Sequence, residues 1–255
     1  MTTLRTIAFG LILIYLVVAM LLVIFQRQFL YFPTPDVSHN FPVMSLESGD
    51  ETINVITLNP HKAKAILYFG GNAETVLYNA QDFADWLPDH TIYLLNYRGY
   101  GGSTGSPTEQ GLYADALALY DEIHQSHDSV SVIGRSLGSG VATLLATQRP
   151  LTSVVLITPY DSIRQVAQDL LPIYPMSLLL KDQYDSLSRT GQINAPVLIM
   201  TAENDRVIPA KHSDALFKAF TNQQAQRTVI EGADHNNLSS APEYRKTLID
   251  FIVAH

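Results

Sequence analysis

The most prominent feature of the hydropathy pattern is one uninterrupted apolar stretch near the N-terminus. Residues Ile7–Phe25 contain neither a charged residue nor a proline. A helix rises about 1.5 Å per residue, so this run is about 28 Å long and matches the hydrocarbon core of a bilayer. The following segment, Gln26–Pro33, carries bulky residues where a signal peptidase requires small ones. We expect an uncleaved membrane anchor over residues 1–30 rather than a cleaved signal or a buried core helix.

The charges that flank this stretch favour one orientation. The α-amino group and Arg5 precede it, whereas Arg27, soon followed by Asp36, comes after it. Positive charge is enriched on cytoplasmic flanks. We therefore expect a single-pass membrane protein with a cytoplasmic N-terminus and an extracytoplasmic domain.

From about Met44 onward, short β-rich runs alternate with helical ones. This alternation predicts an α/β fold with a mostly parallel, twisted sheet and helices on both faces. The middle runs are continuously apolar, as expected of strands buried on both faces. No repeat or linker interrupts residues 31–255, which we expect to form one domain. The expected strands are Ile53–Leu58, Ala65–Phe69, Ile92–Asn96, Val130–Ile133, Val154–Ile157, Val197–Met200 and Thr228–Ile230.

Helix signals lie between these strands. Ser106–Glu109 has the form of a capping box with Pro107 at the first helical position, and Ser240–Glu243 opens the last helix in the same way. The long connection at about 160–195 holds the apolar segment Leu170–Leu180. That segment is either a crossover helix interrupted by prolines or a short lid over a pocket near the membrane. After the capping box at Ser106–Glu109, apolar residues recur at helical spacing and predict a helix; they are Leu112, Ala116, Leu119 and Ile123.

Composition narrows the function. The 255 residues carry a net charge of −8 and no basic run, so nucleic acid is not an expected partner. The chain has no cysteine, which excludes disulfides, cysteine-ligated metal centres and cysteine nucleophiles.

A candidate nucleophile lies in the sequence Gly134-Arg135-Ser136-Leu137-Gly138, a G-x-S-x-G motif. It follows an expected strand and precedes the helical run Val141–Thr147, which is the context of a nucleophile on a tight strand-to-helix turn. The glycines are needed because side chains two residues either side of the serine would collide. The alternative is a glycine-rich turn in which Ser136 is incidental.

A serine hydroxyl needs an imidazole to accept its proton, and the imidazole needs a carboxylate to orient it. In this arrangement the acid and the base follow the serine, each in a loop after a later strand. Asp205 and His235 have that order and position. Glu203 and Asp234 are the competing carboxylates. Glu203 lies closer to the strand, and Asp234 is adjacent to the histidine in sequence.

Acyl transfer also requires two backbone N–H donors for the oxyanion, one of them from the residue after the serine. Leu137 supplies that donor. The second is expected in the loop after the strand that ends at Phe69, where Gly70 and Gly71 precede Asn72. Asn72 is the expected donor, and the alternative is that the two glycines form only a tight turn.

With these residues the chain resembles membrane-anchored α/β-hydrolase-domain serine hydrolases of the bud-emergence-protein and serine-aminopeptidase-like group. The resemblance extends over nearly the whole chain. Two positions depart from the family pattern, which usually has histidine at Gly70 and aspartate at Asn96. The matching features are the apolar N-terminus followed by Tyr31-Phe32-Pro33, the loop Gly70-Gly71-Asn72-Ala73, the segment Tyr97-Arg98-Gly99-Tyr100-Gly101, the Ser136 motif, Asp205 and His235.

The resemblance implies hydrolysis of carboxylic esters, thioesters or lysophospholipids through a covalent acyl-enzyme, without a metal or other cofactor. The expected partners are a lipid bilayer and an acyl-ester substrate, and the anchor favours a lipid-borne one. The alternatives are an amidase or peptidase of the serine aminopeptidase type, acyl transfer to an acceptor other than water, and a non-catalytic membrane-tethered scaffold.

Overall fold

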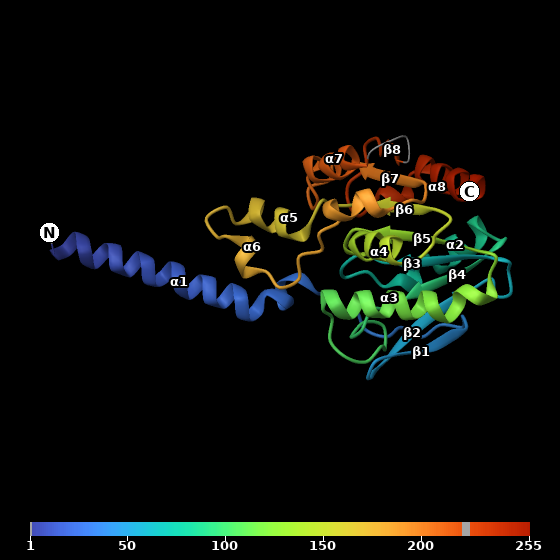
Figure 1. Ribbon diagram of the computed structural model, residues 1–255, viewed down its shortest axis with the longest axis horizontal. Coiled ribbons are helices and arrows are strands. Elements are labelled where there is room, and N and C mark those ends of the chain that lie inside the picture. The colour runs from blue at the N-terminus through green and yellow to red at the C-terminus, as the bar shows by residue number, and fades with distance from the viewer. Residues whose placement is uncertain (1, 221–224) are drawn as a thin grey trace.

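A computed structural model describes residues 2–220 and 225–255. One long helix, α1 (Thr2–Leu30), projects from the end of a layered α/β domain (Figure 1). The expected N-terminal apolar helix is thus confirmed. By length and composition, Thr3–Leu30 is able to cross a membrane, a property that an anchor shares with a signal sequence.

The domain is built on an eight-stranded sheet with the order β1-β2-β4-β3-β5-β6-β7-β8. Strands β1 and β2 are antiparallel to each other, β2 is antiparallel to β4, and all other neighbours are parallel. The expected fold is therefore confirmed, and all seven expected strands are present. The strands are β1 (Val43–Ser48), β2 (Glu51–Leu58), β3 (Lys64–Phe69), β4 (His90–Leu95), β5 (Ser129–Arg135), β6 (Val154–Ile157), β7 (Val197–Ala202) and β8 (Ala225–Ile230).

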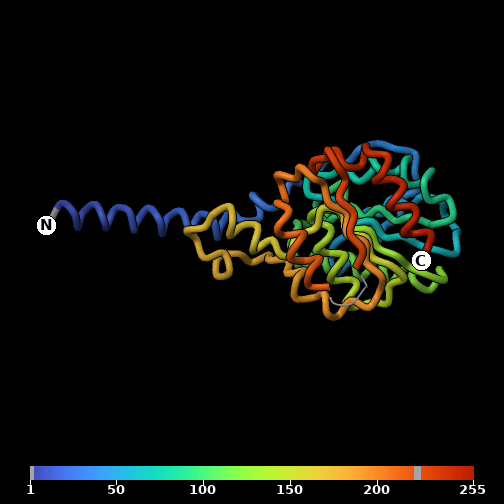
Figure 2. Tube along the Cα trace, turned by 90° about the horizontal axis from the view of Figure 1, so that it is seen from above, coloured from blue at the N-terminus to red at the C-terminus, as the bar shows by residue number. Residues whose placement is uncertain are grey.

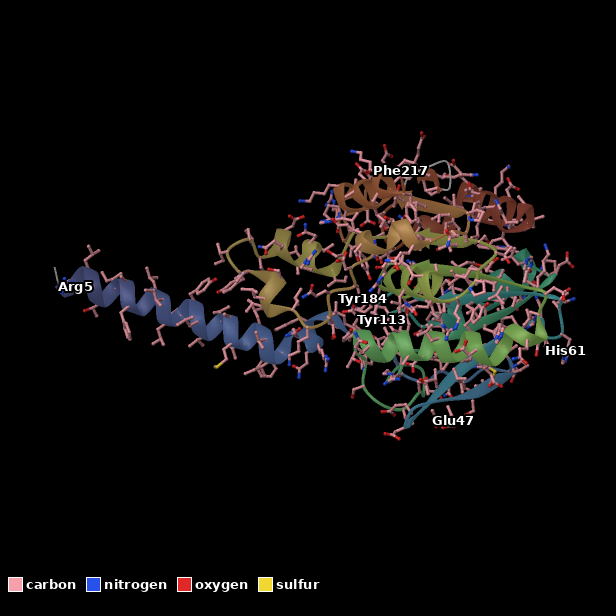
Figure 3. All side chains as sticks on the ribbon, viewed as in Figure 1. Arg5, Glu47, His61, Tyr113, Tyr184 and Phe217 are labelled. Atoms are coloured by element: carbon pink, nitrogen blue, oxygen red, sulfur yellow. The ribbon has the colours of Figure 1, made fainter. Side chains whose placement is uncertain are left out.

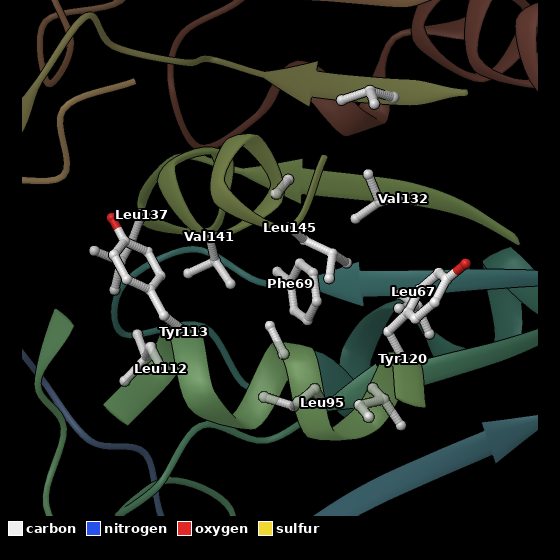
Figure 4. Packing of buried hydrophobic residues seen from close by; sticks show 14 of the residues in the cluster. Leu67, Phe69, Leu95, Leu112, Tyr113, Tyr120, Val132, Leu137, Val141 and Leu145 are labelled. Carbon is white, nitrogen blue, oxygen red and sulfur yellow. The ribbon is translucent and has the colours of Figure 1, made fainter. Parts of the chain in front are cut away.

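Alternation along β3 shows how the sheet is covered on both faces. Leu67 and Phe69 belong to the cluster formed with α3 and α4 (Figure 4), whereas Ile66 and Tyr68 belong to the cluster formed with α2 and α8. Both sets are buried, which explains why the run is continuously apolar. The main helices of the domain are α2 (Ala80–Trp86), α3 (Glu109–Ile123), α4 (Leu137–Gln148), α7 (Ala210–Ala219) and α8 (Pro242–Ala254).

Both predicted helix starts need correction. The N-cap of α3 is Thr108, whose hydroxyl accepts a hydrogen bond from the Gly111 N–H at 2.9 Å, so Pro107 lies before the helix and Ser106 caps nothing. Ala241, not Ser240, occupies the N-cap of α8, although Pro242 does take the first helical position. In Ser106-Pro107-Thr108 the proline has a possible cap on either side, and the Thr108 hydroxyl takes that role.

The connection between β6 and β7 contains two short helices, α5 (Ile163–Leu170) and α6 (Met176–Leu179), joined by a proline-containing turn. We call residues 163–180 the lid segment. Both views place it beside the C-terminal half of α1 (Figures 1 and 2). Its base is held by the Glu109 carboxylate, which accepts hydrogen bonds from the backbone N–H groups of Gln183 and Tyr184 at 2.6 and 3.0 Å. The ring of Tyr184 packs edge-on against Tyr113 at this junction (Figure 3).

Candidate active site

Ser136 lies on the turn between β5 and α4 with an unusual backbone conformation. Its φ is +49° and its ψ −114°, a region that residues other than glycine rarely adopt. The Ser136 N–H donates to the Ile157 carbonyl at 2.8 Å, and its own carbonyl accepts from the Ser139 hydroxyl at 2.6 Å. These bonds hold the strained turn on the neighbouring strand and on the first turn of α4.

The two glycines of the motif are required by close backbone packing. A Cβ at Gly134 would lie 2.7 Å from the Cβ of Ala142 in α4. A Cβ at Gly138 would overlap the carbonyl oxygen of Phe69, at the end of β3. Both positions are sterically closed, as expected for a nucleophile turn of this kind.

The structure brings Ser136, His235 and Asp205 into one hydrogen-bonded chain. The Nε2 atom of His235 lies 3.0 Å from the Ser136 Oγ, and its Nδ1 lies 2.7 Å from the Asp205 Oδ2. The other carboxylate oxygen of Asp205 accepts from the backbone N–H groups of Val207 and Ile208 at 2.9 and 2.8 Å. The carboxylate is therefore fixed and aimed at the imidazole, which is itself buried.

The competing carboxylates point elsewhere. Glu203 accepts from the Gly232 N–H at 2.8 Å. Asp234 accepts from the N–H groups of Asn236 and Asn237, which closes its own loop. No described residue other than Asp205 offers His235 a carboxylate within ion-pair distance.

The loop after β3 approaches the serine closely. A Cβ at Gly71 would lie only 3.6 Å from that of Ser136. The Gly71 N–H is already bonded to the Glu74 carboxylate at 2.7 Å. No described residue accepts a hydrogen bond from the backbone N–H of Asn72 or of Leu137. Both residues line the same cavity as Ser136.

The side chain of Asn72 fastens this loop to the end of α1. Its Nδ2 donates to the carbonyl of Leu30 at 2.6 Å, and its Oδ1 accepts from the Phe32 N–H at 3.0 Å and from the Tyr100 hydroxyl at 2.9 Å. A helix leaves its last carbonyls without intrahelical donors, and here the loop provides one.

Two residues without an assigned role in the sequence analysis, Glu74 and Arg135, brace the site. The Glu74 carboxylate accepts from the Tyr68 hydroxyl, and Arg135 forms an ion pair with it at 3.1 Å while donating to the carbonyl of His235 at 3.2 Å. Burial alone would lower the pKa of Arg135, but Glu74 together with Tyr68 and Tyr244 outweighs it and the pKa is raised. Arg135 thus remains charged and links the loop after β3 to the histidine loop.

The family departure at Gly70 has a steric reason. A Cβ there would lie 2.7 Å from the Val76 side chain and 3.3 Å from the Glu74 carboxyl carbon. The Val76 side chain, and less tightly the Glu74 carboxylate, occupy the space next to Gly70, so a side chain at that position would have to displace Val76.

Arg98, which the motif left unassigned, has a structural role. It donates to both carboxylate oxygens of Asp115, at 2.9 and 2.5 Å, and Asp115 is fully buried. The pair ties the loop after β4 to α3, away from Ser136.

A cavity of about 460 Å³ lies in front of Ser136. Its walls come from three sources: the last turns of α1, the lid segment, and the loops that carry the site. Nearly all of the lining side chains are apolar. They are Leu22, Gln26, Phe29, Leu30, Asn72, Ser136, Leu137, Tyr160, Ile163, Val166, Ala167, Leu170, Leu171, Met176, Leu179, Leu180, Val207 and Ile208.

No group of three or more metal-ligating side chains occurs within the described ranges. His124 and His127, which lie near the end of α3, both have backbone partners. The ring of His124 contacts the carbonyl of Asp121 at 3.0 Å, and that of His127 contacts the carbonyl of Lys62 at 2.8 Å.

Comparison with known proteins places this geometry in context. The dienelactone hydrolase family matches residues 106–247, which is more than half of the chain. An uncharacterized protein of Mycobacterium tuberculosis is 33% identical over 229 residues, 83% of this chain and 81% of that protein. The α/β-hydrolase domain-containing protein WAV2 of Arabidopsis thaliana is 26% identical over 91% of this chain and 89% of its own length.

Solved structures share the fold. The esterase Pf2001 of Pyrococcus furiosus superposes with a TM-score of 0.70 at 15% identity, covering 88% of this chain and 99% of the esterase. Est1E of Butyrivibrio proteoclasticus, solved with ferulic acid bound, superposes with a TM-score of 0.68 at 18% identity, covering 83% of this chain and all of Est1E.

Proposed function

This chain belongs to the dienelactone hydrolase family and is a hydrolase of the α/β type, and from that premise we propose that it cleaves acyl esters through a covalent acyl-enzyme on Ser136. The observation that carries the proposal is the hydrogen-bonded chain from Ser136 through His235 to Asp205. The strained turn at Ser136 supports it, because such strain persists where a nucleophile must be exposed.

In the proposed reaction the Ser136 Oγ attacks the ester carbonyl while His235 Nε2 takes the hydroxyl proton. The imidazolium that forms is stabilised by Asp205, which accepts the Nδ1–H and stays ionised. The negative charge on the former carbonyl oxygen is held by the N–H groups of Asn72 and Leu137. The intermediate collapses, His235 gives its proton to the departing alcohol, and water then repeats the sequence to release the acid and restore Ser136.

The cavity supports an ester with an extended apolar acyl group. Its volume is in the range of small-molecule sites, and its few polar lining groups lie close to Ser136 or on Gln26 and Tyr160. An apolar chain gains free energy there roughly in proportion to the area it removes from water. The same machinery is able to cleave amides, but the described lining of the cavity contains no charged side chain that would recognise a peptide terminus.

A fluorophosphonate probe tests the nucleophile directly. We expect it to label the wild-type protein and not Ser136→Ala, and Ser153→Ala is the matched control. Ser153 is a buried serine just before β6 whose hydroxyl donates to the Ser131 hydroxyl. Labelling that survives in Ser136→Ala contradicts the proposal. Hydrolysis of esters of increasing chain length, with Ser136→Ala as the blank, then defines the acyl preference.

We also propose that α1 is an uncleaved anchor, with residues 31–255 as the extracytoplasmic hydrolase domain. The composition of α1 and the charges at its ends support this arrangement. Full-length protein in membranes should resist extraction by alkaline carbonate and dissolve only in detergent. Extraction by carbonate alone would refute the anchor, and protease protection of the domain in sealed vesicles would test its side.

A further inference from the structure

The tip of the lid segment exposes large apolar side chains that the domain leaves uncovered. Leu170, Ile173 and Leu178 are 75%, 69% and 81% exposed. Elsewhere in the described part of the domain, exposed apolar residues such as Val229 and Val253 are scattered along different elements. A cluster of this kind on one short segment is typical of a surface that meets another apolar phase.

The tip is attached to α1 at two levels. Near the end of α1, Gln26 donates to the carbonyl of Leu179 at 3.1 Å and accepts from the Lys181 N–H at 2.6 Å. Nearer the N-terminus of α1, the ring of Tyr15 stacks on that of Tyr174 with centroids 4.7 Å apart. The Tyr15 hydroxyl donates to the carbonyl of Ile173 at 2.9 Å.

The contact of Tyr15 with the tip indicates how deep in a membrane the tip would lie. Tyr15 precedes Phe25, the end of the apolar stretch, by ten residues, which is about 15 Å along a helix. The hydrocarbon core of a bilayer is about 30 Å thick. If α1 crosses a membrane, the segment that contacts Tyr15 lies inside the leaflet on the side of the domain, and not at its surface.

Much of the backbone of the tip is hydrogen-bonded within the protein. Non-helical backbone inside a membrane is tolerated only where its polar groups are bonded within the protein. Pro172 and Pro175 have no N–H, and their carbonyls accept from the Gln168 side chain and from the Leu178 and Leu179 N–H groups, respectively. The Met176 N–H donates to the Gln168 side chain at 3.1 Å.

The nearest charge is also neutralised. Asp169 precedes the tip and forms an ion pair with Lys211 of α7, and the Nε2 atom of His212 lies 2.9 Å from the Asp169 carboxylate. The described residues from 170 to 180 carry no charge of their own.

We propose that the tip, Leu170–Leu179, is a second membrane-embedded element, immersed beside α1 in the leaflet nearest the domain. The cavity before Ser136 is walled by α1 and by the lid segment, so its mouth then opens into the acyl-chain region of that leaflet. The substrate is a membrane-resident lipid ester whose acyl chain reaches Ser136 laterally without passing through water. This inference rests on the proposed function for its substrate, and on the apolar tip for its geometry.

The natural chain has no cysteine, so single-cysteine variants report one position each. Full-length Ile173→Cys and Leu178→Cys, labelled with an environment-sensitive fluorophore, are placed in phosphatidylcholine vesicles. Val253→Cys is the matched control, because Val253 is an exposed apolar residue on α8, whose end lies across the domain from α1 (Figure 1). Aqueous iodide and lipids with a spin label on the acyl chain are the two quenchers.

We expect the labels at 173 and 178 to be quenched by the spin-labelled lipid and shielded several-fold from iodide, with the opposite result at 253. Iodide quenching at 173 equal to that at 253 would overturn the proposal. This outcome does not depend on activity, so it is distinct from a failure of the proposed function.

A kinetic comparison tests the lateral route. Ile173 and Leu178 do not line the cavity, so Ile173→Asp and Leu178→Asp should retain turnover of a short, water-soluble ester. With a long-chain ester embedded in vesicles, we expect a several-fold higher apparent KM for both variants and no increase for Val253→Asp. Equal kinetics on the embedded ester in all these variants would refute the lateral route. The proposed chemistry is tested separately by Ser136→Ala, and it stands if only that variant loses activity.

Discussion

Replacing Asp205 by asparagine should lower turnover by several orders of magnitude, because it moves the ring proton of His235 to the wrong nitrogen. The hydrogen bonds around Asp205 explain this. Oδ1 accepts from two backbone N–H groups, those of Val207 and Ile208, whereas Oδ2 faces the imidazole at 2.7 Å. In the variant the amide oxygen must take the position of Oδ1, because an NH₂ group there would face two donors. That orientation would leave both N–H groups without their acceptor, so the side chain adopts the other one.

The NH₂ group of the substituted side chain then points at His235 Nδ1, which must act as an acceptor. The ring proton moves to Nε2, the atom 3.0 Å from the Ser136 hydroxyl, and the imidazole is no longer able to take the serine proton. The same change of tautomer in a serine protease lowers kcat about 10⁴-fold, which corresponds to about 5 kcal/mol of transition-state stabilisation. The fold should remain intact because the shape of the side chain is unchanged.

The assay is kcat for a chromogenic ester, with thermal unfolding as the check on folding. Glu203→Gln and Asp234→Asn are matched controls, since each removes one charge from a neighbouring carboxylate that caps backbone N–H groups and does not contact His235. Both should stay within a few-fold of wild type. A folded Asp205→Asn that keeps wild-type turnover, or a Glu203→Gln that loses it, would refute the assignment.

Three further changes probe the scaffold. Asp115→Ala leaves Arg98 without its buried partner and should lower the free energy of unfolding by about 3–5 kcal/mol, whereas Lys246→Ala, which breaks an exposed pair on α8, should leave it nearly unchanged; equal effects in denaturant titrations would contradict this. Gly138→Ala forces a methyl group against the Phe69 carbonyl and should cost about 1–3 kcal/mol and much of the turnover, because both amides beside Ser136 must shift; unchanged kcat would show that the loop tolerates the movement. Burial lowers the pKa of His90 below 6.5, so the unfolded chain binds a proton that the folded chain does not, and this contribution to stability is complete above pH 6.5 and lost as the pH falls through the lowered pKa; His90→Gln should flatten the acid side of the stability profile, and an identical profile would exclude His90 as the cause.

Much of the fold can be predicted because its signals are local. Strands buried on both faces are continuously apolar, and the serine motif requires glycines that are visible in the sequence. Strand β1 is not among the expected strands because its pattern is that of an edge strand. Burial alternates along Val43–Ser48, but the apolar Val43 is exposed and the buried position 48 carries a serine, so the polar and apolar residues do not mark the two faces clearly.

The candidate site is predictable to a similar degree. Ser136, Asp205 and His235 are identified by their order after successive strands, and parallel strands bring such loops to one edge of the sheet. Glu74 and Arg135 receive no role from the sequence, although both lie within or beside recognised motifs. Their partners come from loops that are distant in sequence, and no local spacing encodes such a contact.

The hydrogen bond between the Asn72 side chain and the Leu30 carbonyl at the end of α1 has a practical consequence for anyone preparing this enzyme. Cutting the chain before Tyr31 would remove the long apolar helix, but it would also remove the Leu30 carbonyl that holds Asn72 and the four α1 side chains that wall the cavity. An inhibitor screen on that fragment would select compounds for an altered pocket. Drug discovery and crystallisation should therefore start from the intact chain in nanodiscs or detergent.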